Sequence, residues 1–129
     1  MNTTGILNPH LLSLLARIRH TNRLAIVDHA FPFWPEIETV DLSLVRGIPT
    51  IPQVLDAFVP GFKIGPVFMA EEFNRHNTPE QQAEFQRALG GAAITFEPHV
   101  EFKQRVPEAI GLIRTGDETM YGNLIIESA

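Results

Sequence analysis

The chain has 129 residues, of which 44% are hydrophobic and 19% charged, and its formal net charge is −5. A chain of this length suits one domain, which hides roughly two-thirds of the unfolded surface, so we expect a single domain over residues 1–129. The acidic balance argues against a nucleic-acid partner, because phosphates need a basic face. The absence of cysteine excludes disulfides, thiol catalysis and thiolate metal sites.

The start of the chain carries no sign of export or membrane insertion. Residues 1–4 lack the basic region followed by an apolar stretch that a secretory signal needs. No apolar run approaches the roughly 18 residues of a membrane span. We therefore expect a cytoplasmic protein with no membrane partner.

The first predicted element is a helix that begins at Pro9, with Asn8 as its cap. Its apolar face is expected to combine four side chains: Leu11, Leu12, Leu15 and Ile18. After a polar turn, residues 24–27 form a short, continuous apolar run that is typical of a buried parallel strand. Asp28 ends this strand.

Strands and helices alternate along the rest of the chain. The segment 31–35 contains two prolines and must be irregular. Strands are predicted at 37–42, 67–70, 93–96, 109–113 and 124–126. Helices are predicted at 51–58, at 100–106, and between the capping signal at 78–81 and the glycine pair at 90–91. This alternation predicts an α/β fold with a mainly parallel sheet flanked by helices.

Two polar side chains near the amino terminus are candidates for chemistry. His20 follows the first helix; an imidazole titrates near neutrality and suits a general acid, although the dipole at a helix end also favours a histidine there. Asp28 closes a buried strand, and ligands of open α/β sheets collect outside the carboxyl ends of strands. A structural turn is the alternative for Asp28.

A second group of candidates lies in the last third of the chain. His99 and Lys103 are four positions apart in a predicted helix, so they share one face, as a solvated basic stripe also would. Tyr121 and Asn123 flank Gly122 directly before the last strand. If this segment is extended, both side chains point to the same side, and Gly122 lets a substrate approach the backbone. The alternative is an ordinary turn that enters the strand.

Several common sites are missing from the sequence. The five histidines show no H-x-x-x-H spacing, so we expect no metal site. There is no phosphate loop, dinucleotide motif or nucleophile elbow. The aromatic side chains of 31–34 could stack on a sugar, but such residues more often fill a core or subunit contact. The candidates together indicate a site that moves protons on a small polyol.

As a set, the motifs of the chain resemble those of the D-ribose pyranase and L-fucose mutarotase family, along nearly the full length. The matching segments are Gly5–Asn8, His20-Thr21, the strand ending in Asp28, Pro32, Gly47–Pro49, Gln53–Leu55, Met69–Glu72, His76-Asn77, His99 with Phe102-Lys103, Ile113–Gly116 and Tyr121–Asn123. The resemblance implies an α/β fold and a ring-shaped homo-oligomer, commonly a decamer. It also implies a monosaccharide site in a cleft between adjacent subunits.

The resemblance also implies roles for single residues. It makes His20 the proton donor. It assigns sugar binding to Asp28, His99, Tyr121, Gly122 and Asn123, with Lys103 as an additional candidate. His99 and the segments 69–72 and 76–77 are similar to the ribose branch, which interconverts the pyranose and furanose forms of D-ribose. Residues 28–32 are similar to the fucose branch.

Alternative functions remain open at this point: an L-fucose-type mutarotase, a non-catalytic sugar-binding or transport-associated protein, or a purely structural oligomer. Opening a sugar ring needs proton transfers to and from its oxygens and already proceeds unaided in water, so no cofactor is expected. His20 precedes and Asp28 follows the same strand, and the four steps from Leu24 to Asp28 span about 13 Å at roughly 3.3 Å per residue. A monosaccharide does not bridge that length, so either the turn at 21–23 folds back over the sheet or a second subunit completes the pocket. We expect the composite pocket.

Overall fold

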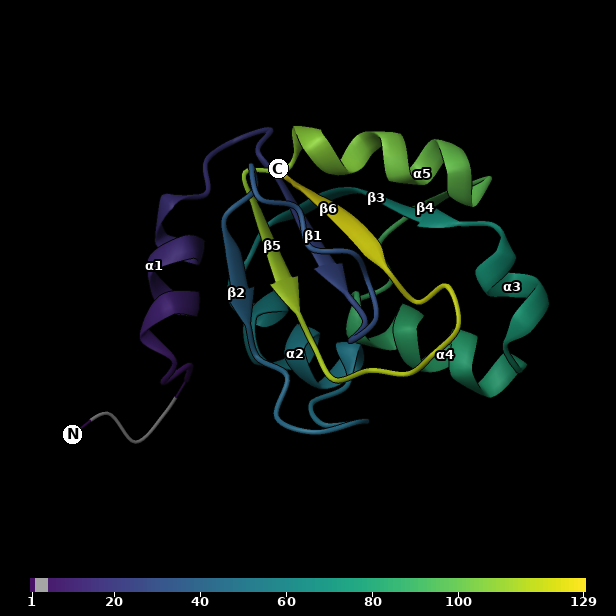
Figure 1. Cartoon of the computed structure of the whole chain (residues 1–129), viewed down its shortest axis with the longest axis horizontal. Helices are drawn as coiled ribbons and strands as arrows, with labels where there is room; N and C mark the ends of the chain where they lie inside the picture. Colours follow the sequence, from purple (N-terminus) through teal and green to yellow (C-terminus); the bar gives the residue numbers. More distant parts are fainter. Residues whose placement is uncertain (2–4) are drawn as a thin grey trace.

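One six-stranded sheet organises the chain (Figure 1). Its strands, in chain order, are β1 (Arg23–Val27), β2 (Thr39–Asp41), β3 (Ile64–Ala70), β4 (Ile94–Glu97), β5 (Gly111–Arg114) and β6 (Leu124–Ser128). Their order across the sheet is β2-β5-β1-β6-β3-β4. The strand β6 runs antiparallel to both of its neighbours, β1 and β3, and all other pairs are parallel.

Helices connect the strands. They are α1 (Pro9–Arg17), α2 (Ile51–Phe58), α3 (Glu72–His76), α4 (Pro79–Ala88) and α5 (His99–Arg105), with the 3₁₀ turns η1 (Val59–Gly61) and η2 (Val106–Glu108). The predicted α/β fold with a mainly parallel sheet is confirmed. The sequence did not predict α3, which is short and has no side-chain cap to mark its start.

The computed structural model describes Met1 and residues 5–129. The segment 2–4, on which the expected absence of a secretory signal partly depends, lies outside the described residues. In the described part of the chain, no helix has the length and apolar character needed to cross a membrane.

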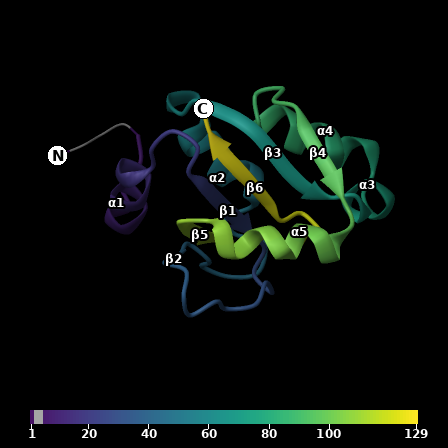
Figure 2. The same ribbon diagram turned by 90° about the horizontal axis from the view of Figure 1, so that it is seen from above.

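Two apolar clusters cover the two faces of the sheet. The larger one joins β-strand side chains such as Ile26 and Ile113 to α1, α2, α3 and α4. The smaller one packs Phe102 of α5 and Phe31 against the opposite face. Figure 2 shows α5 on one side of the strands, and α2 and α4 on the other. Burial on both faces explains why the central strands are continuous apolar runs.

The inward face of α1 differs from the predicted one. Leu11, Leu14 and Ile18 are buried, whereas Leu12 is 45% exposed and Leu15 only partly buried. The buried face of this helix therefore follows positions i, i+3 and i+7, counted from Leu11. The prediction was wrong for Leu12. Leu14 packs where Gly111 leaves room, since a Cβ on Gly111 would lie 2.5 Å from Leu14 Cδ1.

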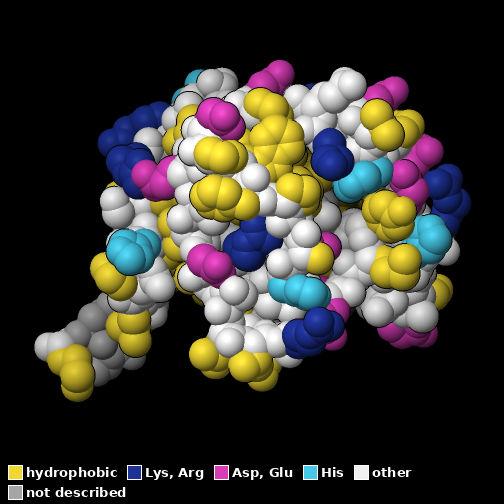
Figure 3. Space-filling model, viewed as in Figure 1, with side chains coloured by type: hydrophobic (Ala, Val, Ile, Leu, Met, Phe, Trp, Pro, Cys, Tyr) yellow, Lys and Arg dark blue, Asp and Glu magenta, His cyan; other side chains and the backbone are white. Residues whose placement is uncertain are grey.

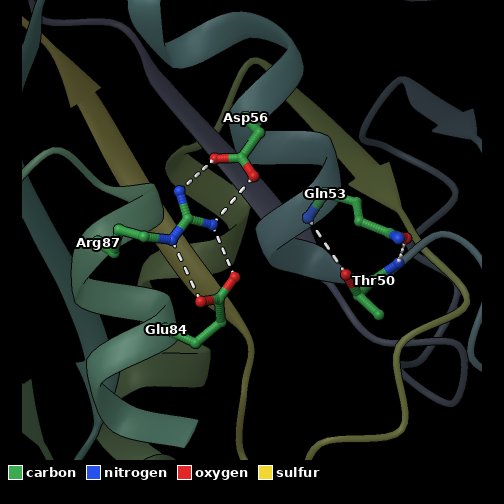
Figure 4. A network of polar contacts seen from close by, with 5 residues as sticks. All are labelled: Thr50, Gln53, Asp56, Glu84 and Arg87. Atoms are coloured by element: carbon green, nitrogen blue, oxygen red, sulfur yellow. Dashed lines mark hydrogen bonds and ion pairs between the residues drawn. The ribbon is translucent and has the colours of Figure 1, made fainter. Parts of the chain in front are cut away.

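Three predicted helix starts, those of α1, α2 and α4, are confirmed by their caps, whereas α5 begins at His99 without a side-chain cap. The Asn8 side chain accepts a hydrogen bond from Leu11 N–H at the start of α1. Thr50 and Gln53 form a reciprocal capping box at the start of α2 (Figure 4), and α4 begins with the same arrangement. Arg87 of α4 links Asp56 and Glu84 nearby, which ties α2 to α4.

The capping box of α2 allows a stability prediction. Thr50→Ala removes the hydroxyl that accepts from Gln53 N–H, and we expect the free energy of unfolding to fall by about 1 kcal/mol. Chemical denaturation measures this change. Thr50→Ser keeps the hydroxyl and is expected to retain most of the stability; an equal loss in both variants would contradict a capping role.

Candidate functional site

A cavity of about 280 Å³ opens at the edge of the sheet where β1 ends and β6 begins. Its lining residues are Asp28, Ala30, Phe31, Pro32, His99, Lys103, Met120, Tyr121 and Asn123. Because β6 is antiparallel, the residues that precede it lie at the same edge as the residues that follow β1. The volume is close to the lower end of the roughly 300–1,000 Å³ that is common for small-molecule sites.

Asp28 and Asn123 are joined at the base of this cavity. The Asp28 backbone N–H donates to Asn123 Oδ1 at 2.8 Å. Asn123 is only 4% exposed, and it directly precedes Leu124, which pairs with Ile26 of β1. The Asp28 carboxylate accepts from Ala30 N–H at 3.1 Å, and its burial raises the pKa of Asp28. The site thus holds a half-buried carboxylate next to a carboxamide.

His99 is the first residue of α5. Its backbone N–H lies 3.1 Å and 3.2 Å from the two carboxylate oxygens of Glu72, which accept from it. Its Nδ1 atom is buried and has no hydrogen-bond partner among the described residues. Burial lowers the pKa of His99 from its ordinary value, so the neutral imidazole predominates at pH 7. A neutral imidazole has one donor and one acceptor nitrogen, and because Nδ1 is buried, Nε2 is the nitrogen left to contact a ligand.

Tyr121 lies between two imidazoles. Its ring centroid is 5.2 Å from that of His99 and 5.2 Å from that of His76. The backbone of Tyr121 has a φ of 55°, an unusual left-handed conformation for a side chain of this size. Asn77 holds the preceding residue, since its Nδ2 donates to the Met120 carbonyl at 2.9 Å. Figure 3 shows histidine and apolar side chains side by side near α3 and the adjacent end of α5.

The conformation of this turn corrects one expectation. Met120 and Tyr121 form a turn that the Gly122 N–H closes by donating to the Thr119 carbonyl, so the segment is not extended, yet Tyr121 and Asn123 both line the cavity. Gly122 is buried and is not one of the lining residues. A Cβ on Gly122 would lie 3.2 Å from Phe85 Cζ, so the missing side chain also serves close packing.

The charges around His99 allow a pH prediction. Asp28 raises and Lys103 lowers the pKa of His99. We therefore expect Lys103→Gln to move the His99 titration to higher pH and Asp28→Asn to move it to lower pH, as measured by NMR of the imidazole protons. Lys63→Gln, which changes the only other lysine, is expected to leave it in place. Shifts in the opposite directions would contradict the geometry.

The lowered pKa of His99 also sets how protein stability depends on pH. The pKa of His99 is lower in the folded protein than in the unfolded chain, so the unfolded state binds the proton more tightly. The contribution of His99 to stability is present above its unfolded pKa and is lost as the pH falls through its folded pKa.

The structure brings most of the candidate residues together. Asp28, His99, Lys103, Tyr121 and Asn123 line one cavity. Two lining residues, Ala30 and Met120, had no role expected from the sequence, whereas the sequence left Phe31 open as a sugar-stacking residue and Pro32 belongs to the resemblance. The proline pair at 32 and 35 could have indicated Ala30, because it forces the chain after Asp28 into a loop at this edge.

His20 does not reach this cavity in the same chain. It is exposed in the turn before β1, where Thr21 N–H donates to the Ser128 carbonyl at the end of β6. Asp28 follows the other end of β1. Five steps separate Arg23, the first residue of β1, from Asp28, or roughly 16 Å, which agrees with the length argument from the sequence.

The aromatic segment 31–34 has mixed roles. Phe31 is buried and also lines the cavity, whereas Phe33 is exposed. Trp34 packs against the smaller core cluster. Among the described residues no group of three or more His, Asp or Glu side chains could hold a metal ion.

Comparison with known proteins identifies the family. The model of the RbsD / FucU transport protein family matches residues 1–129. The chain belongs to this family.

Curated relatives of this RbsD / FucU chain carry one name. This chain is 39% identical over 128 residues to a D-ribose pyranase of Geobacillus kaustophilus. The alignment covers 99% of this chain and 93% of the relative. The chain is also 39% identical to a D-ribose pyranase of Chromobacterium violaceum, with 99% and 97% covered.

Solved structures share the fold. The RbsD of Bacillus subtilis, described in complex with D-ribose, superposes with a TM-score of 0.90 at 30% identity, over 100% of this chain and 98% of that one. The fucose mutarotase of Streptococcus pneumoniae, described in complex with L-fucose, gives a TM-score of 0.78 at 18% identity, with 95% and 92% covered. At that identity the second likeness is one of fold.

Proposed function

We propose that this protein is an isomerase of free monosaccharides that interconverts their ring forms, with D-ribose in its pyranose and furanose forms as the substrate. Relatives named D-ribose pyranase are 39% identical over nearly the whole chain. The observation that carries the proposal is the convergence of the Asp28 carboxylate, the His99 imidazole, the Tyr121 phenol and the Asn123 carboxamide on one small cavity. These are groups that hydrogen-bond sugar hydroxyls.

The chemistry needs two proton movements. Opening the pyranose removes a proton from the anomeric hydroxyl, breaks the bond between C1 and the ring oxygen to leave an aldehyde, and delivers a proton to that oxygen. Attack of the C4 hydroxyl on the aldehyde then closes the furanose, with the two proton transfers reversed. The Asp28 carboxylate and the neutral imidazole of His99 are acceptors that face the cavity, and either can take the anomeric proton. Tyr121 and Asn123 hold other hydroxyls, and Lys103 is an additional contact. Gly122, which was also expected to bind the sugar, is buried behind the lining and contributes by holding Tyr121 and Asn123 in place.

His20 is the proton donor in this proposal, and it comes from a neighbouring subunit. Its position at the opposite end of β1 supports this arrangement, because a monosaccharide does not span roughly 16 Å of strand. The assembly is a ring-shaped homo-oligomer, a decamer, with its sites between subunits, and each chain forms one domain. We place this activity in the cytoplasm; a chain without cysteine needs no oxidising compartment.

NMR exchange spectroscopy on a panel of free sugars tests the proposed function. We expect the protein to accelerate exchange between the ring forms of D-ribose more than exchange between the forms of L-fucose. Faster exchange of L-fucose would assign the fucose mutarotase activity instead. Saturable binding of a sugar with no acceleration of exchange would contradict the isomerase and indicate a binding protein.

A further inference from the structure

The loop that follows β1 supplies four of the cavity-lining residues: Asp28, Ala30, Phe31 and Pro32. It forms neither helix nor strand, so regular structure does not satisfy its carbonyl groups. The backbone N–H groups at its start are held by Asn123 Oδ1 and by the Asp117 carbonyl. The carbonyl groups of the loop need separate partners.

Arg114 supplies these partners. Its guanidinium extends from the carboxyl end of β5, where Arg114 pairs with Val27 of β1. The Nη1 atom lies 2.6 Å from the Phe31 carbonyl oxygen, 3.2 Å from that of His29 and 3.3 Å from that of Asp28. The Nη2 atom lies 3.4 Å from the Pro32 carbonyl oxygen. One side chain thus reaches four carbonyls within five residues.

The charge of Arg114 has no carboxylate partner. In the part of the chain that the structure describes, the other half-buried arginines form ion pairs, Arg23 with Glu127 and Arg105 with Glu97. Arg114 forms none within ion-pair distance among these residues, and its donors go to the loop. A buried cation needs compensation, and four carbonyl dipoles provide it here.

We propose that Arg114 is a positioning residue, which fixes the loop 28–32 so that the Asp28 carboxylate faces the sugar. The planar fork of a guanidinium presents donors in fixed directions, whereas the ammonium of lysine is a compact point charge. Lysine at position 114 keeps the charge and cannot span the four carbonyls. The inference rests on the proposed function for the identity of the ligand, but not for the state of the loop.

The first test measures the conformation of the loop in the absence of sugar. Trp34 is the only tryptophan of the chain, lies just beyond the loop and packs against the core cluster that contains Phe31. We expect Arg114→Lys to move the Trp34 emission to longer wavelength. The control is Arg87→Lys, which also disturbs an arginine with four hydrogen bonds, away from the cavity (Figure 4). The same emission in both variants would contradict a role in holding the loop.

The second test measures whether the effect of Arg114 on sugar affinity depends on Asp28. We expect Arg114→Lys to raise the dissociation constant of D-ribose about tenfold, which corresponds to about 1.4 kcal/mol, and to change KM more than kcat. In an Asp28→Asn background the same substitution is expected to weaken binding by less than about twofold. The reason is that Arg114 acts through the contact between the Asp28 carboxylate and the sugar, which this background already lacks. An equal loss in both backgrounds would overturn the positioning role.

The two tests separate this inference from the proposed function. If the wild-type protein binds no monosaccharide, the proposed function fails, and the Trp34 comparison still decides whether Arg114 holds the loop. If the wild-type protein binds D-ribose and Arg114→Lys binds it equally well, the positioning role fails and the proposed function stands.

Discussion

Replacing His20 by alanine is expected to slow the exchange between ring forms of the sugar by about 10²–10⁴-fold, the usual contribution of one positioned acid or base. Sugar affinity is expected to stay close to that of the wild-type protein. The reason is that His20 delivers a proton to the ring oxygen, while the residues around Asp28 hold the hydroxyl groups. NMR exchange spectroscopy measures the rate, and calorimetric titration measures the affinity.

His10→Ala is the matched control for this experiment. His10 is also an exposed histidine of the amino-terminal segment, on α1 and outside the cavity of Asp28. We expect this variant to exchange ring forms at the wild-type rate. If His20→Ala also keeps the full rate, His20 is not the proton donor and its favourable place at a helix end is the better explanation.

Replacing Asn123 by alanine is expected to weaken sugar binding by about 10–100-fold, because a buried hydrogen bond and its unpaired partner together account for about 1–3 kcal/mol. The carboxamide oxygen accepts from Asp28 N–H at 2.8 Å. Its loss therefore leaves that N–H without a partner and loosens the segment that presents the Asp28 carboxylate. The donor end of the carboxamide is lost to the sugar at the same time.

Gln86→Ala controls for the loss of a carboxamide. The Gln86 side chain donates to the Ala92 carbonyl at 2.9 Å and does not line the cavity. We expect it to reduce thermal stability and leave sugar affinity unchanged. Similar affinities for the Asn123→Ala variant and the wild-type protein would remove Asn123 from the site and reassign it to the turn that enters β6.

Local sequence signals were sufficient for most of the fold. Caps such as Asn8 and Thr50 are decided by nearest neighbours along the chain, so these helix starts were predicted correctly. The buried strands were recognised because both faces of the sheet are covered, which makes a strand such as β1 apolar and buried from Leu24 to Val27. The direction of β6 was not predictable in this way, since its apolar run of three residues, Leu124–Ile126, carries no sign of its orientation.

The features that the sequence did not predict depend on contacts between distant parts of the chain. Leu12 and Leu14 are equally apolar, and the space that Gly111 leaves lets Leu14 pack against the sheet. The left-handed backbone of Tyr121 is held by Asn77, which is 44 positions away. Neither contact leaves a pattern of fixed spacing in the sequence.

In the candidate site, too, the sequence indicated some residues, while the roles of others required coordinates. The carboxyl end of β1 indicated Asp28, because ligands of open α/β sheets collect outside such ends; Asn123 precedes β6 and lies at the same edge because β6 is antiparallel, which the sequence did not indicate. The roles of Glu72 and Arg114, which hold the backbone of His99 and of the Asp28 loop, required coordinates. Both belong to segments that resemble the family, so the motif had marked them without showing what they do.

Complementation between two inactive variants tests the central claim most directly: the proton donor of one subunit acts on the sugar held by another. His20→Ala and Asp28→Asn chains are unfolded, mixed in equal amounts and refolded together, and mass spectrometry verifies that mixed oligomers form. About a quarter of the sites then combine an intact His20 with an intact Asp28, if the site joins two subunits at random. The account predicts that the mixture recovers about that share of the wild-type exchange rate. Verified mixed oligomers that stay as inactive as the two parents would contradict it.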